Sequence, residues 1–545
     1  MMRSAQNLDS FCILLFIASF VHSVYIPSIF LFFYIIITVC FVARLARMLR
    51  STASRTGTPS VALRRYLATV ADGAPKIPKR EGDISDAFVS LSGAKRDPLP
   101  DRFRELKCAL VRGREKQIVD SWKRLLRSLR EENELIARKG SAIIPQVEFS
   151  NLDSGIASLK DEILKRGAVV VRGVVPEAEA RAYKDEVEDY VKTNPWTRAF
   201  PPNDPQVYEL YWSAPQLKAR SHPSLLTVQR QLMSLLWHTS SPSSLISLTE
   251  PLTYADRLRI RQPGDASFAL GPHIDGGSVE RWEPDGYGRG GVYDAVFDGN
   301  WESYDPWDAS GRVDAVNNLH DGLGACSMFR MWQGWLSMSH CGPNQGTLLV
   351  NPLMHMATAY VLLRPFFRPI RKGTGAAFLD EANWELAGEN EMTSDLQGAS
   401  PGHGQELTDD LHPHLELAQT MVHVPEIKPG DFVAWHCDTI HSVDKQHNGT
   451  SDSSVLYIPI CPVTAFNAQY LVRQRDAFRA GTPGPDFPGG EGETRHAGRP
   501  TEQQLRGWST GDGLRAMGFE KLMADAGALP GQRKVVEEAN RILGF

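Results

Sequence analysis

The spacing of hydrophobic residues changes along the chain and predicts two kinds of structure. Between residues 101 and 140, hydrophobic positions recur every three or four residues among many charges, which is the period of an amphipathic helix. The next stretch, "GIASLKDEILKRGAVVVRGVV", predicts a helix followed by a valine-rich strand, and "PEAEARAYKDEVEDYV" predicts a helix that begins at a proline. We expect these helices to pack against a sheet.

From Leu258 to Pro462 the hydrophobic runs become short and are separated by Gly, Pro, Asn and Asp. Runs such as "RLRIRQPG", "GTLLVNPL" and "DFVAWH" are typical of strands, and many short strands favour a barrel or a sandwich. Residues 286–324 and 373–413 are polar and rich in turn formers, so we expect insertions over the mouth of the barrel. Helices are expected after Pro462, and the predicted fold class is α+β.

The first part of the chain differs from the rest. Residues 11–43 carry no charge and are long enough to cross a bilayer; four arginines follow them and one precedes them. This bias predicts a membrane-anchored protein with a cytosolic catalytic domain. An alternative rests on the stretch from Met48, which is rich in Arg, Ser, Thr and Ala and lacks acids, as mitochondrial presequences do. If translation starts at Met48, we expect a protein of the mitochondrial matrix.

The predicted organisation has three parts: an anchor or targeting region at 1–72, a polar linker at 73–97 and one large domain at 98–545, whose β-rich core spans about 258–462. The formal net charge of -5 is spread over mixed acidic and basic residues, so nucleic acid is not expected as a partner. Seven scattered cysteines without a C-x-x-C pair argue against a disulfide framework or a structural zinc site. A reducing compartment is favoured.

The motif "GPHIDGG" carries the first candidate chemistry. His273 and Asp275 are two positions apart at the expected end of a strand, and such side chains point to the same face. One imidazole and one carboxylate can therefore reach a common ion, and a distant histidine would complete the facial triad that leaves positions open on iron(II). A lone H-x-D is more often an ordinary surface pair than a metal site, so the context decides.

The run "KPGDFVAWHCDTIHSV" supplies two candidates for the third ligand. His441 is favoured over His436, because a strand that follows could turn it inward. His436 stands beside Trp435 and is expected to be a core or outer-shell histidine, with its ring satisfied by a backbone carbonyl. Asp438 and Ser278 are the candidates for outer-shell partners of the ligands.

Several longer motifs add a resemblance to a known family. The order of H-x-D, "GWLSMSHCGPNQGTLLVNP" and "GDFVAWHCDTIH" resembles the clavaminate-synthase-like and phytanoyl-CoA-hydroxylase-like iron(II)/2-oxoglutarate oxygenases. "HIDGGSVERWEP", "FDGNWESYDPWDASGR" and "YIPICPVTAFNAQYL" are similar to a fungal and bacterial domain-of-unknown-function family within that group. The resemblance, from about Ser85 onward, implies a double-stranded β-helix (jelly-roll, cupin-like) with Fe(II) held by His273, Asp275 and His441, 2-oxoglutarate as co-substrate and O2 as oxidant.

One departure from that family concerns the co-substrate. These oxygenases usually place an Arg or Lys on the strand after the distal histidine, where it pairs with the far carboxylate of 2-oxoglutarate, whereas "NGTSDSSVLYIPICPVT" has none. Arg330 in "SMFRMWQGW" is the preferred substitute, and Lys445, Arg259 and Arg261 are the others. A structural ion pair is an equally reasonable role for Arg330.

We expect an iron(II)- and 2-oxoglutarate-dependent hydroxylase or oxidase that acts on a small molecule. A non-catalytic metal or small-molecule sensor on the same barrel is the alternative, because the expected cation is missing. A metal-dependent hydrolase is less favoured, since the sequence lacks a second cluster of ligands. Five aromatic residues in the first insertion would line a pocket or simply pack in a long loop: Trp282, Tyr287, Tyr293, Trp301 and Tyr304.

Overall fold

An eight-stranded sheet is the largest element of the computed structural model, which describes residues 80–93, 96–267, 269–323 and 326–545. Neighbouring strands are antiparallel except for the first pair, which is parallel. In spatial order the strands are β1 (Gln146–Glu148), β2 (Ala168–Arg172), β14 (Phe432–His436), β8 (Trp332–Ser337), β16 (Ser453–Tyr457), β6 (Leu258–Arg261), β4 (Val207–Tyr208) and β3 (Ala199–Phe200).

A second, five-stranded sheet carries the candidate ligands. Its strands are all antiparallel, and their spatial order is β12 (Gln405–Glu406), β7 (His273–Ile274), β15 (His441–Val443), β9 (Leu348–Val350) and β13 (Val422–His423). Side chains of both sheets meet in one apolar cluster, in which Val350 of β9 is joined by Trp335 of β8 and Val455 of β16. The metal-site candidates therefore lie between the two sheets. Two small sheets pair β10 (Phe367–Pro369) with β11 (Trp384–Leu386) and β5 (Ser247–Leu252) with β17 (Cys461–Val463).

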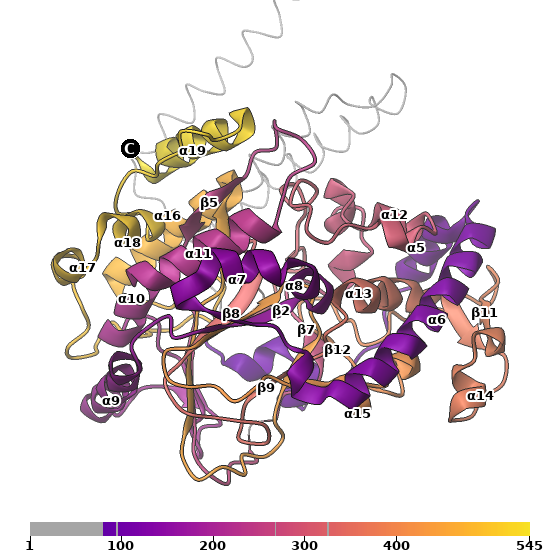
Figure 1. Cartoon of the computed structure of the whole chain (residues 1–545), viewed down its shortest axis with the longest axis horizontal. Coiled ribbons are helices and arrows are strands. Elements are labelled where there is room, and N and C mark those ends of the chain that lie inside the picture. Colours follow the sequence, from indigo (N-terminus) through magenta and orange to yellow (C-terminus); the bar gives the residue numbers. More distant parts are fainter. Residues whose placement is uncertain (1–79, 94–95, 268, 324–325) are drawn as a thin grey trace, which may run out of the picture. The chain divides into compact units, whose positions relative to one another are not determined.

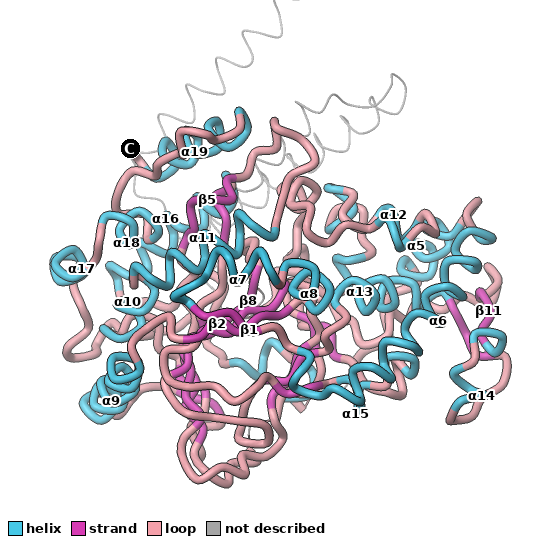
Figure 2. The backbone as a smooth tube through the Cα atoms, viewed as in Figure 1, coloured by secondary structure: helices cyan, strands magenta, loops and turns pink. Residues whose placement is uncertain are grey.

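Helices cover the outer face of the large sheet (Figure 1). Ile156 and Ile163 pack there in one cluster with Val169 and Val171, the side chains of β2 that point outward. The covering helices are α7 (Leu152–Ser158), α8 (Lys160–Arg166), α9 (Glu177–Thr193) and α11 (Pro223–Leu236). Figure 2 shows β1, β2 and β8 in the middle of the described part of the chain, with α7 and α8 beside them and β11 apart at the edge, near α6 (Glu115–Lys139).

The amphipathic region at 101–140 is helical, as predicted, and forms two helices. Ile118, Trp122, Leu125 and Leu129 are fully buried on one face of α6, and the Trp122 ring stacks on Phe367 with a centroid distance of 4.4 Å. The lateral helices are α5 (Arg102–Val111), α6 (Glu115–Lys139), α12 (Asp294–Phe297), α13 (Met354–Leu363), α14 (Ala376–Leu379) and α15 (Leu417–Thr420). The C-terminal region is helical as well and packs against α10 (Ala214–Arg220). Its helices are α16 (Ala465–Ala480), α17 (Glu502–Trp508), α18 (Gly511–Ala516) and α19 (Pro530–Leu543).

The α+β fold class is confirmed, but the membrane-anchored location is not and is corrected. Among the described residues, no helix combines the length and apolarity that a bilayer crossing requires. The predicted anchor at 11–43 and the possible presequence from Met48 both lie outside the described residues. All described residues belong to one unit, Lys79–Phe545.

Candidate metal centre

A glycine turn at the end of β7 presents the first two candidate ligands. The strand ends at Ile274, and Asp275 is followed by Gly276 and Gly277, whose φ angles are 71° and 97°. Residues with a Cβ rarely adopt such φ values, so the two glycines allow the chain to turn sharply directly after the carboxylate. His273 and Asp275 thereby lie close together at the end of β7, with Nε2 of His273 and Oδ1 of Asp275 3.8 Å apart.

β15 brings the third candidate beside the first two. His441 is the cross-strand partner of His273, and the centroids of the two imidazole rings are 4.1 Å apart. The Nε2 atom of His273 lies 3.8 Å from Oδ1 of Asp275, and the Nε2 atom of His441 lies 3.8 Å from Oδ2. The three residues thus form a cluster whose ligand atoms all lie within 4.8 Å of one another. This spacing suits a single cation between them.

Backbone carbonyls orient both imidazoles. The Nδ1 atom of His273 lies 2.8 Å from the carbonyl oxygen of Gly271, and Nδ1 of His441 lies 3.0 Å from that of Thr439. Because a carbonyl oxygen only accepts, Nδ1 carries the hydrogen and the lone pair of Nε2 faces Asp275. These carbonyls take the outer-shell place that the sequence analysis offered to Asp438 and Ser278.

Burial and neighbouring charges shift the pKa values of His441 and Asp275 in the directions that favour cation binding. Burial, aided by the neighbouring His273, lowers the pKa of His441 to about 3, so this ring is neutral at physiological pH. Burial alone would raise the pKa of Asp275, but His273, His441 and Arg330 outweigh it and lower that pKa. A neutral imidazole and an ionised carboxylate are the forms that bind a metal ion.

The cluster opens onto a cavity with about 130 Å³ of space open to water. Apolar and aromatic side chains form much of its lining, among them Phe88, Leu270, Trp335 and Trp435. The second insertion contributes residues 402–404, so part of it lies at the cavity as predicted. Such a lining, with a few polar groups, is typical of small-molecule sites.

The basic residues proposed for the co-substrate lie in different surroundings. Lys445 is exposed and is not among the described residues that line the cavity. Arg261 is fully buried away from the cavity, where Asp265 and the Asp444 carbonyl take its hydrogen bonds. Arg330 lines the cavity, but its Nη2 lies 3.9 Å from Oδ2 of Asp275.

Two further arginines of the β6 region line the cavity. Arg257 has acidic neighbours, with Nη1 3.6 Å from Glu209 and Nε 3.5 Å from Asp256. Arg259 is 2 % exposed and donates from Nη2 to the Gly346 carbonyl at 3.0 Å. Within the described part of the chain, its Nε has no hydrogen-bond partner and no carboxylate lies within 4.0 Å. In "DRLRIR" an arginine stands at every second position, and this pattern is the sequence signal for the arginines of the β6 region.

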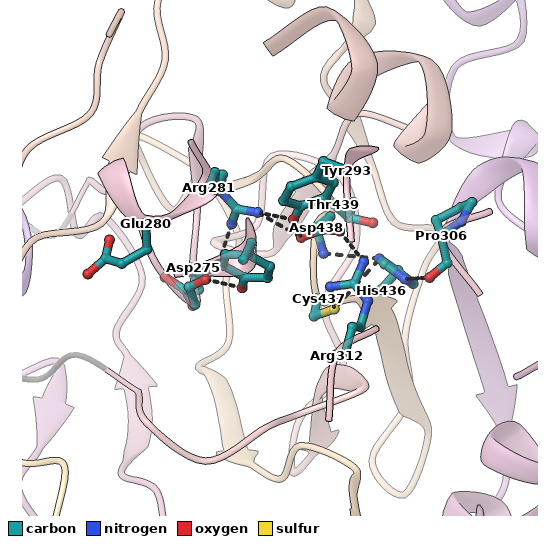
Figure 3. Close-up of polar contacts among 12 residues, drawn as sticks. Asp275, Glu280, Arg281, Tyr293, Pro306, Arg312, His436, Cys437, Asp438 and Thr439 are labelled. Atoms are coloured by element: carbon teal, nitrogen blue, oxygen red, sulfur yellow. Dashed lines mark hydrogen bonds and ion pairs between the residues drawn. The ribbon is translucent and has the colours of Figure 1, made fainter. Parts of the chain in front are cut away.

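A buried polar network centred on Asp438 links the two ligand-bearing segments (Figure 3). Oδ1 of Asp438 accepts from Arg281 at 2.8 Å and Oδ2 accepts from Arg312 at 2.6 Å, while the hydroxyls of Tyr293 and Tyr304 donate to the same carboxylate. Arg281 also donates to the backbone carbonyl of Asp275 at 2.9 Å. Tyr293 and Tyr304, which the sequence analysis left between pocket lining and packing, therefore belong to this network.

His436 stands apart from the three clustered residues. With Cys437 and Asp438 it forms a second compact group of potential ligands. Its Nε2, however, donates to the Pro306 carbonyl at 3.1 Å, and its Nδ1 accepts from the Asp438 backbone at 3.0 Å. Both ring nitrogens are used, which is the structural role that the sequence analysis gave to this histidine.

Residues 80–93, which fall in the predicted linker, contact the cavity. They form η2 (Ile84–Ala87) and α4 (Val89–Ser92), and the Phe88 ring meets the His273 ring edge-on with a centroid distance of 4.9 Å. The polar, Gly- and Pro-rich composition of 73–97 hid this role, because few apolar residues mark it in the sequence.

The fold and the site define an α+β protein with a buried two-histidine, one-carboxylate cluster in a cavity. Residues 97–519 match the Gig2-like family, and the chain belongs to that family. It is 32 % identical over 395 residues to the Escherichia coli protein named "Uncharacterized protein YbiU", a match that covers 70 % of this chain and 87 % of the relative.

Solved structures of similar proteins support the same assignment. The Candida albicans protein GlcNAc Inducible Gene 2 (DUF1479) is 32 % identical with a TM-score of 0.71, covering 83 % of this chain and 97 % of that one. A structure described as "Putative Oxidoreductase from Salmonella typhimurium LT2" is 30 % identical with a TM-score of 0.64, covering 77 % and 98 %. The resemblance to a domain-of-unknown-function family is thus confirmed at the level of the Gig2-like family.

Proposed function

We propose that this protein is an iron(II)- and 2-oxoglutarate-dependent oxygenase that acts on a small molecule. The observation that carries the proposal is the convergence of His273, Asp275 and His441 at the wall of a cavity. Two imidazoles and one carboxylate on one side of an ion leave its other positions for co-substrate and oxygen. The word oxidoreductase in the description of the Salmonella relative is in keeping with this class.

The strand order also favours the finer fold prediction. The ligands come from β7 and β15 of the smaller sheet, and β14, β8, β16 and β6 lie side by side in the larger one. Two facing antiparallel sheets that exchange strands along the chain are the arrangement of a double-stranded β-helix, or jelly roll. We propose that architecture for the region from β6 to β17.

In the proposed reaction the protein binds the metal and the co-substrate, orients them and limits the access of water. His273, Asp275 and His441 would hold Fe(II) through their Nε2 and carboxylate atoms, and the bound iron and 2-oxoglutarate would supply the oxidising chemistry. Trp335, Trp435 and neighbouring apolar side chains line the cavity, so a bound organic molecule would displace water from this apolar surface.

Arg259 is our choice for the residue that binds the far carboxylate of 2-oxoglutarate. It lies opposite Val455 of β16, on the strand beside the one where the family usually places its basic residue. Its charge is buried without an acidic partner among the described residues, an expensive state that a bound carboxylate would relieve. Arg330, preferred from the sequence, is turned toward the carboxylate of Asp275 instead.

Replacing Arg259 with methionine is expected to weaken 2-oxoglutarate binding by about 10- to 100-fold, the range for a lost charge-assisted hydrogen bond. Calorimetric titration of the protein loaded with Co(II), which substitutes for iron without turnover, measures this. Metal affinity should be unchanged and the melting temperature should not fall, because the variant removes a buried charge that has no acidic partner among the described residues. A larger loss in Arg330→Met than in Arg259→Met would contradict the choice, and Lys445→Met is the exposed control.

The proposed activity itself has a direct test. Purified protein supplied with Fe(II), 2-oxoglutarate and oxygen is expected to form succinate, at least slowly without a substrate, and Zn(II)-loaded protein should form none. Absence of succinate at every iron loading would contradict the oxygenase. Retained binding of metal and 2-oxoglutarate without turnover would instead favour the non-catalytic sensor.

A further inference from the structure

We infer that residues 80–93 are a wall of the reaction cavity and that Phe88 selects ligands with an apolar group beside His273. Ile84, Ala87 and Phe88 all line the cavity that contains the three clustered residues. The match to the family model begins at residue 97, so these residues lie before the matched region.

The segment is held to the rest of the protein at three separate places. The Ala87 carbonyl accepts from the backbone of Gly404 at 2.9 Å, and the Ser90 backbone donates to the Glu406 carboxylate at 3.2 Å. Arg198 pairs with Glu81 at 2.8 Å and donates to the Gly82 carbonyl at 2.7 Å. The Arg80 carbonyl accepts from Gly489 at 2.8 Å. Contacts with residues this far apart in the sequence fix the segment in place over the cavity.

Gly404 is required for the position of Phe88. A Cβ atom at residue 404 would stand 2.7 Å from Cε1 of the Phe88 ring, which is closer than non-bonded atoms approach. The φ angle of Gly404 is not in the left-handed region, so the missing side chain serves this close approach and not the turn. Substituting Gly404 with alanine should therefore displace the ring while Phe88 itself remains.

The residues that form this wall are apolar. Ile84, Ala87, Phe88 and Leu270 are buried in one apolar cluster, with Val443 packed against it, and all five line the cavity. With Arg259 assigned to 2-oxoglutarate, Arg257 and Arg330 are the further arginines that line the same cavity, each also near an acidic side chain. The ligand class that fits both linings is a small carboxylate with a hydrocarbon or aromatic group, whose apolar part is buried against Phe88.

The inference rests on the proposed function for the metal, but its test does not depend on turnover. The probes are 3-phenylpropionate and propionate, titrated calorimetrically into the full chain with and without Co(II). Burial of the phenyl ring should make 3-phenylpropionate bind at least about tenfold more tightly to the wild type. Phe88→Ala and Gly404→Ala should each reduce this ratio to about threefold or less. Leu91→Ala, from the same segment but outside the cavity lining, should keep it.

The outcomes separate the two proposals. Equal affinity of the wild type for both probes, failure to bind either, or an unchanged ratio in folded Phe88→Ala and Gly404→Ala would overturn the inference. Failure to bind Co(II) with the probe preference intact would overturn the metal centre and leave the apolar wall standing. Near-ultraviolet circular dichroism reports whether each variant is folded.

Discussion

Substituting Asp275 with asparagine is expected to lower metal affinity by more than about 100-fold, beyond the 10- to 100-fold typical of an outer-shell change. The amide keeps the shape of the side chain but removes the only anion in the cluster. Two imidazoles then face the cation without a compensating negative charge. Titration with Co(II), followed by absorbance, measures the affinity, and succinate formation should be lost in parallel.

Asp256→Asn is the matched control for this variant. Asp256 is another carboxylate at the same cavity, and its Oδ1 accepts from the backbone of Arg257 at 2.7 Å. Asp256 is not one of the three clustered residues, so we expect unchanged metal affinity. If Asp275→Asn binds Co(II) as tightly as the wild type does, Asp275 is not a ligand and the proposed centre fails.

The sequence was most informative where local spacing determines geometry. His273 and Asp275 lie two positions apart, so a strand end places them together whatever the rest of the fold does. His441 was favoured over His436 because it lies beyond the strand, and the structure places it opposite His273 in the next strand. These three positions could be derived before any tertiary contact was known.

Tertiary contacts decided the rest. The sequence favoured Arg330 over Arg259 and Arg261, and only the structure shows that Asp265 pairs with Arg261 and that Arg330 lies near Asp275. Phe88 lies 185 positions from His273 in the chain (273 − 88), so no local pattern could predict that their rings touch.

The Asp438 network explains how distant segments are kept in register. Asp438 precedes His441 by three residues, and Arg281 follows Asp275 by six. Arg281 binds both Asp438 and the Asp275 carbonyl, so it joins the loop after β7 to the segment before β15 (Figure 3). The position of Asp275 relative to His441 therefore depends on Arg281, which among the described residues makes no hydrogen bond or ion pair with either imidazole.

Substituting Asp438 with alanine is expected to destabilise the protein by about 3–5 kcal/mol, the cost of removing one member of a buried ionic network. Arg281 and Arg312 are 2 % and 4 % exposed, so both charges would stay buried without their shared carboxylate. Denaturation in urea, followed by circular dichroism, measures the free energy of unfolding. Metal affinity should fall as well, because the loop that carries Asp275 loses its link to β15.

The pH dependence of stability gives an independent check on the same carboxylate. Burial would raise the pKa of Asp438, but Arg312 and Arg281 outweigh it and hold that pKa far below its ordinary value. A carboxyl with a depressed pKa stabilises the fold above its unfolded pKa of about 3.9, and this contribution fades only as the pH falls toward the folded pKa. Between pH 7 and pH 5 the difference in stability between wild type and Asp438→Ala should therefore stay constant.

Replacing all three charged residues together distinguishes the loss of the ion pairs from the loss of side-chain volume. Asp438→Leu combined with Arg281→Met and Arg312→Met removes all three charges together, and apolar substitutes for a complete buried network are often tolerated. We expect the triple variant to recover much of the stability that Asp438→Ala loses, yet to bind metal weakly, because no side chain then holds the Asp275 carbonyl. If Asp438→Ala is as stable as the wild type, water screens these charges in the folded protein. The network would then not be the link between the two ligand-bearing segments.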